Sequence, residues 1–93
     1  MLVQGAIDLL IEEDDGSLTI VDYKTDARRR GEGDRELAAR LADKHSAQLS
    51  YYRRAAEEVF RKPVNRTVIY SFALGGEIDV DTKIKGTESG KDA

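Results

Sequence analysis

The stretch 19–26 places the strongest constraint on how this chain can fold. It reads Thr-Ile-Val-Asp-Tyr-Lys-Thr-Asp, a β-branched and apolar run that ends in charged residues. Because side chains alternate across a strand, Asp22 and Lys24 lie on one face while Val21 and Tyr23 lie on the other. A carboxylate and an ammonium group at the end of a buried strand are costly unless they pair or bind something. We therefore expect a strand that ends in a polar site.

A second aspartate is expected on the preceding strand. Residues 2–12 alternate as a strand does, and an Asp-Gly turn signal follows them. In a hairpin the residue numbers of each facing pair add up to the same value, the index sum. A sum of 30 sets Asp8 opposite Asp22, and a sum of 32 sets it opposite Lys24. A sum of 31 would move Asp8 to the other face. A shared polar site therefore requires an odd-length loop or a bulge, with Gly16 in a left-handed conformation.

The remaining segments predict an α/β fold with a mixed sheet. Residues 34–44 and 46–60 read as two amphipathic helices, the second of which ends at Pro63. The apolar stripe of the second helix contains Leu49, Tyr52, Ala56, Val59 and Phe60. Residues 66–74 and 77–80 read as a third strand and a short edge strand. The order β-β-α-α-β-β predicts a helical crossover between the second and third strands of one sheet.

Length and composition limit the class of protein. The 93 residues fit one small domain, with a core over 1–80 and a polar, disordered tail over 81–93. Because core-like sequence begins at residue 2, we expect a fragment whose upstream part is missing. The absence of cysteine excludes disulfides and iron–sulfur ligation within this chain and fits a cytoplasmic protein. No apolar run approaches the about 20 residues of a membrane span.

The charge of the chain excludes one mode of nucleic-acid binding. A formal net charge of −3 argues against a protein that coats nucleic acid by bulk charge. It leaves open a local basic groove. Arg28, Arg29 and Arg30 could contact phosphates, or they could be an ordinary solvated loop.

The polar residues of the two strands fit phosphodiester chemistry. Two aspartates on neighbouring strands can share a magnesium ion, which takes one or two carboxylates plus water and substrate phosphate. A lysine on the same face can hold the attacking water and stabilise the charge that develops on the phosphate. The alternative is that Asp22 and Lys24 form a surface ion pair and that Asp8 satisfies the end of a strand.

Three motifs in order resemble those of the PD-(D/E)XK nucleases. They are G-x-[IV]-D at residues 5–8, D-Y-K-T at residues 22–25 and Q-x-x-x-Y at residues 48–52. The match covers roughly residues 3–80 and is closest to the RecB/AddA-type nuclease domain at the C-terminus of helicase–nucleases. The resemblance implies a restriction-endonuclease-like core whose N-terminal helical part, with further metal-site residues, is missing from this chain.

The resemblance also assigns roles to residues. Asp8 and Asp22 would be catalytic ligands of Mg²⁺, with Mn²⁺ able to substitute, and the backbone carbonyl of Tyr23 would be a further ligand. Lys24 would be the catalytic lysine.

In the same way, Gln48 and Tyr52 would contact substrate or support the site. The implied reaction is exonucleolytic or endonucleolytic cleavage of DNA during double-strand-break repair and recombination. The implied partners are DNA, a helicase part of the same polypeptide and a second helicase–nuclease subunit. An uncovered sheet face would favour a homodimer, and a fragment without upstream ligands would cut poorly.

Two questions stay open at this point. The chain could instead be a non-catalytic DNA-binding or structural module that retains the nuclease fold. His45 lies downstream of the D-Y-K motif and reads as an exposed helix residue rather than a metal ligand. Thr25 and Asp26 could position the loop after the strand.

Overall fold

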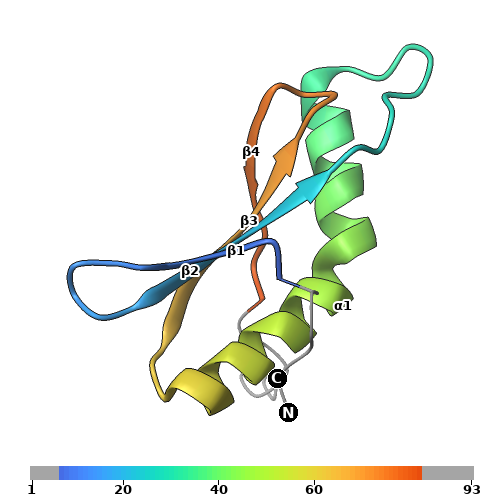
Figure 1. Ribbon diagram of the computed structural model, residues 1–93. Helices are drawn as coiled ribbons and strands as arrows, with labels where there is room; N and C mark the ends of the chain where they lie inside the picture. Colours follow the sequence, from blue (N-terminus) through green and yellow to red (C-terminus); the bar gives the residue numbers. More distant parts are fainter. Residues whose placement is uncertain (1–6, 83–93) are drawn as a thin grey trace, which may run out of the picture.

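The computed structural model describes residues 7–82 and shows a four-stranded sheet with one helix across one of its faces (Figure 1). The elements are, in chain order, β1 (Leu9–Glu12), β2 (Leu18–Lys24), α1 (Asp34–Phe60), β3 (Val64–Ser71) and β4 (Gly76–Asp79). The sheet has the order β1-β2-β3-β4, with β2 and β3 parallel and both outer pairs antiparallel. The α/β class, the mixed sheet and the helical crossover between β2 and β3 are therefore confirmed.

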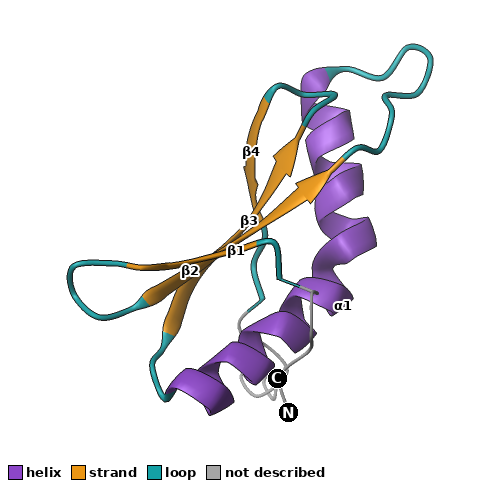
Figure 2. Ribbon diagram, viewed as in Figure 1, coloured by secondary structure: helices purple, strands orange, loops and turns teal. Residues whose placement is uncertain are grey.

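The two predicted helices are one continuous helix, so the predicted order β-β-α-α-β-β is wrong and the order is β-β-α-β-β (Figure 2). No glycine or proline lies within α1 to interrupt it. The polar segment 43–46 stays helical because its side chains find partners. Lys44 and His45 contact Asp26, and the Ser46 hydroxyl donates to the Asp43 carbonyl.

The hairpin between β1 and β2 has the register that a shared polar site requires. Leu9 pairs with Val21, which corresponds to an index sum of 30. The loop between the two strands has an odd number of residues, and Gly16 adopts a positive φ of 90°. A residue with a side chain rarely adopts this conformation, so glycine suits the position.

The ends of three predicted strands differ from the observed ones. The first strand, predicted over 2–12, begins at Leu9, so Asp8 lies just before β1; residues 1–6 lie outside the described residues. The strands predicted over 66–74 and 77–80 are Val64–Ser71 and Gly76–Asp79. The predicted disordered tail lies largely in 83–93, outside the described residues.

The core lies between α1 and the sheet face that it covers. Its fully buried large side chains include Ile20, Leu37, Leu41, Leu49, Val64 and Ile69. The predicted stripe is wrong at its end, because Val59 and Phe60 are exposed. They lie in the last turn of α1, beyond the last buried residue of the helix, Ala56, and just before the chain turns back into β3.

The other face of the sheet carries exposed apolar side chains. Leu9, Ile11, Tyr23 and Phe72 are all exposed, and the ring of Tyr23 packs against Tyr70 and Phe72. This finding agrees with the predicted uncovered face, whereas dimerisation through it stays a prediction. Within residues 7–82, no helix is long and apolar enough to cross a membrane.

Candidate active site

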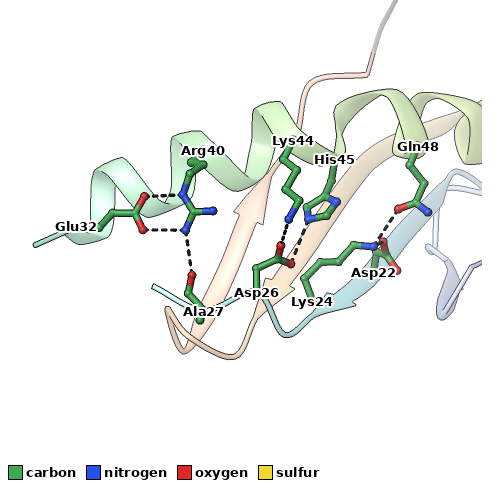
Figure 3. Close-up of polar contacts among 9 residues, drawn as sticks. All are labelled: Asp22, Lys24, Asp26, Ala27, Glu32, Arg40, Lys44, His45 and Gln48. Atoms are coloured by element: carbon green, nitrogen blue, oxygen red, sulfur yellow. Dashed lines mark hydrogen bonds and ion pairs between the residues drawn. The ribbon is translucent and has the colours of Figure 1, made fainter. Parts of the chain in front are cut away.

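A lysine and a buried aspartate meet at the end of β2, on the face covered by α1. Lys24 Nζ lies 2.9 Å from Asp22 Oδ2 and donates a hydrogen bond of 2.9 Å to Gln48 Oε1 (Figure 3). The side chains of Lys24 and Asp22 are 19% and 5% exposed. Gln48 belongs to α1, so the helix holds the ammonium group over the carboxylate.

Asp8, which lies just before β1, joins this pair. Because Leu9 pairs with Val21, the same register places the preceding Asp8 beside Asp22. Asp8 Oδ2 accepts a hydrogen bond of 2.9 Å from the backbone N–H of Tyr23. The structure therefore brings together four of the predicted site residues, from the segment before β1, from β2 and from α1.

The two carboxyl groups have opposite pKa shifts. Burial, and next the contact with the Asp8 carboxyl, raise the pKa of Asp22 above its usual value, while Lys24 opposes the rise. The contact with Asp22 and the N–H of Tyr23 lower the pKa of Asp8. Two carboxylates this close repel each other when both are ionised. As the pH rises, Asp8 therefore loses its proton before Asp22 does. A cation bound between them would relieve this repulsion.

The donors at this site fit a divalent cation. Asp22 Oδ2 is buried and accepts no hydrogen bond, with the Lys24 ammonium as its ion-pair partner. Among residues 7–82, no group of three or more histidine, cysteine or acidic side chains could hold a metal ion. The side-chain donors at the site are therefore two carboxylates, which is the number that magnesium often takes when water and substrate supply the rest.

Tyr52 lies in the core at the border of the site, one helical turn after Gln48. Its side chain is buried among the core residues. Burial, and after it the charge of Asp22, raise the pKa of the Tyr52 phenol. Tyr52 therefore packs the helix against the sheet, and the charge of the nearby Asp22 carboxylate acts on its phenol group.

The next contact along α1 was missed from the sequence. The Asp26 carboxylate accepts a hydrogen bond of 2.6 Å from Lys44 Nζ and lies 3.2 Å from His45 Nε2. Lys44, followed by His45, lowers the pKa of Asp26 to about 2. The reading of His45 as an exposed residue is wrong, because its side chain is 13% exposed. The sequence signal that could have predicted the Asp26 contact is strand parity, because the alternation of side chains puts Asp26 on the same face as Asp22 and Lys24.

A third contact continues the series toward the start of α1. Arg40 donates to both carboxylate oxygens of Glu32, at 2.7 and 2.8 Å, and to the carbonyl of Ala27 at 3.0 Å. Arg40 is the main cause that lowers the pKa of Glu32 to about 2. Figure 3 shows the three contacts side by side, each joining α1 to the end of β2 or to the loop after it. The helix thus fixes both Lys24 and that loop.

Comparison with known proteins identifies the family. The model of the PD-(D/E)XK nuclease superfamily matches residues 1–88. The chain belongs to the PD-(D/E)XK nuclease superfamily. The family motifs at residues 5–8, 22–25 and 48–52 contribute Asp8, Asp22, Lys24 and Gln48 to the site described above.

The chain is also similar to curated relatives, which are large ATP-dependent helicase/nuclease proteins. It is 44% identical over 81 residues to such a protein from Staphylococcus epidermidis, covering 84% of this chain. It is 46% identical over 81 residues to the protein of the same name from Lachnoclostridium phytofermentans, covering 86% of this chain. The matches span only 6% and 5% of the lengths of these two relatives.

Proposed function

We propose that this chain is the catalytic core of a magnesium-dependent deoxyribonuclease that hydrolyses phosphodiester bonds. The observation that carries the proposal is the buried carboxylate of Asp22, beside Asp8 and under the lysine that Gln48 holds. A carboxyl group whose pKa is raised in the folded state costs stability at neutral pH. A non-catalytic module would gain stability by replacing it, so its retention favours the enzyme.

Each residue of the site has a role in this proposal. Asp8, Asp22 and the carbonyl of Tyr23 would hold Mg²⁺, for which Mn²⁺ substitutes. When bound, the ion lowers the pKa of the attacking water and neutralises charge on the phosphate oxygens. Lys24 lies at the same carboxylate, where its ammonium group orients water and stabilises negative charge that develops on the phosphate. Gln48 holds that ammonium group in place.

The relatives extend the proposal to a larger assembly. Their name describes one subunit of an ATP-dependent helicase/nuclease, and this chain matches a small part of their length. We infer that the substrate is DNA, that a helicase part belongs to the same polypeptide and that a second subunit completes the enzyme. The biological role is cleavage of DNA during double-strand-break repair and recombination. Tyr52 borders the site and would support substrate binding there.

Cleavage of end-labelled DNA by the chain and three variants tests the proposal. Asp22→Asn and Lys24→Gln should lower kcat by about 10²- to 10⁴-fold, because each removes a group that acts on the reacting atoms. Lys62→Gln is the matched control, because this lysine pairs with Glu12 in another part of the molecule. Metal-dependent cleavage that survives unchanged in both site variants would contradict the assignment.

A further inference from the structure

The loop between β2 and α1 separates its three consecutive arginines into two kinds. Arg28 is structural: its Nη2 lies 2.9 Å from Asp34 Oδ1, and its Nη1 donates to the carbonyl of Glu32 at 3.1 Å. These contacts join the loop to the first turn of α1. The open question about the arginine run therefore concerns only Arg29 and Arg30.

The side chains of Arg29 and Arg30 carry uncompensated charge. Both residues are exposed, and in the part of the chain that the structure describes neither side chain forms a hydrogen bond or an ion pair. The charge of the Arg29 side chain acts on Glu32 only as a coulombic interaction without direct contact. The neighbouring acids already have partners, which are Arg40 for Glu32, Arg28 for Asp34 and the Gly33 N–H for Glu36.

Several contacts brace the loop that presents these two arginines. Gly31 adopts a positive φ of 79°, and the N–H of Glu32 donates to the carbonyl of Arg29 at 3.0 Å. Arg40 joins both ends of the loop to α1, through Ala27 and Glu32. A loop braced in this way loses less conformational entropy when it binds a ligand than a loop without such contacts.

We propose that Arg29 and Arg30 bind the phosphodiester backbone of the DNA strand that reaches the Asp22–Lys24 site. The inference rests on the proposed nuclease function and adds a second contact surface to it. A guanidinium group matches two phosphate oxygens at once, and such contacts do not depend on base sequence. The chain as a whole carries −3, yet residues 27–40 contain five arginines and three acids, so this region is locally positive.

The distance between the loop and the site fits a strand that spans both. The Arg40 contact to the loop lies eight residues before Gln48 on α1, which corresponds to about 12 Å along the helix axis. Phosphates of one strand are about 3.4 Å apart along a DNA duplex axis. A strand that reaches Lys24 therefore needs only a few more nucleotides to reach the loop that carries the two arginines.

The salt dependence of DNA binding tests this proposal without requiring cleavage. Fluorescence anisotropy would compare the wild-type chain, the double variant Arg29→Gln/Arg30→Gln and the control Arg54→Gln/Arg61→Gln, with a labelled single-stranded oligonucleotide. Both variants remove two exposed arginines, but Arg54 and Arg61 lie toward the other end of α1. Each phosphate contact on a single strand contributes about 0.7 to the slope of log K against log salt.

The loop variant should therefore flatten the slope by about 1.4, whereas the control should keep the wild-type slope. Between about 50 and 200 mM salt, wild-type affinity should fall about sevenfold more than that of the loop variant. Equal slopes in all three proteins, or no binding by the wild type at low salt, would overturn the proposal.

A parallel titration with Mn²⁺ separates this inference from the proposed function. If metal binds at Asp22 but the slopes are equal, the arginine contact is wrong and the nuclease proposal stands. If the loop variant flattens the slope but no metal binds, the arginines contact DNA in a module that is not a nuclease.

Discussion

Asp26→Asn tests whether the contacts between α1 and the end of β2 stabilise the protein through charge. The substitution keeps the shape of the side chain but removes the charge that faces Lys44 at 2.6 Å and His45 at 3.2 Å. We expect the free energy of unfolding to fall at neutral pH. The loop that leads to Arg29 and Arg30 should also become more mobile.

The size of the effect follows from the pKa of Asp26. Its carboxyl group has a pKa of about 2 in the folded protein, compared with a usual value of 3.8. At about 1.4 kcal/mol for each pKa unit, the ionised form contributes about 2 kcal/mol of stability at neutral pH. Because the folded-state pKa is lowered, this stability is present above pH of about 4 and is lost as the pH falls through about 2. At about pH 3, roughly half of it should remain.

Urea denaturation followed by far-UV circular dichroism measures the difference. With a slope of about 1 kcal/mol/M for a small domain, Asp26→Asn should lower the midpoint by about 2 M at pH 7 and by about half as much at pH 3. Asp43→Asn is the matched control, because Asp43 is an exposed acid of α1, next to Lys44, whose side chain forms no ion pair among the described residues. An Asp26→Asn difference of the same size at both pH values would refute the charge argument.

Three further predictions concern the core and the site. Leu49→Ala should lower the free energy of unfolding by about 2–5 kcal/mol, because Leu49 is fully buried. In the same urea assay, Val59→Ala should change the free energy of unfolding by less than about 0.5 kcal/mol, because Val59 is 46% exposed. Gln48→Ala releases the Lys24 ammonium group and should lower kcat for DNA cleavage about fivefold with little change in KM; an unchanged kcat would contradict this role. Because the pKa of Asp22 is raised, protons should compete with Mn²⁺ for this carboxyl group and weaken Mn²⁺ binding as the pH falls from about 7 toward 4. Calorimetry that finds a constant affinity over this range would rule out competition at this carboxyl group.

The hairpin was predictable from the sequence because its constraints are local. Side-chain parity, an Asp-Gly turn and the need to place Asp8 and Asp22 on one face select an index sum of 30 or 32, and the structure has 30. The crossover into a parallel pair followed from the length of the helical segment between two strands. These features require no knowledge of distant contacts.

The continuity of α1 was not predictable in the same way. Residues 43–46 interrupt the apolar stripe, and a local pattern reads such a gap as a helix boundary. In the folded protein the loop after β2 brings Asp26 to Lys44 and His45, so the polar segment gains partners and the helix continues. The partial burial of His45 has the same cause, because it depends on a residue 19 positions earlier in the chain.

Calorimetric titration of the chain with Mn²⁺ tests the central claim most directly, because it examines the carboxylate site without requiring turnover. We expect saturable binding by the wild type, retained in Asp43→Ala and abolished in Asp22→Ala, since Asp22 supplies a buried carboxylate oxygen that accepts no hydrogen bond. Binding of equal strength in the wild type and Asp22→Ala, or no binding by the wild type, would contradict the assignment of a metal-dependent nuclease site to Asp8, Asp22 and Lys24.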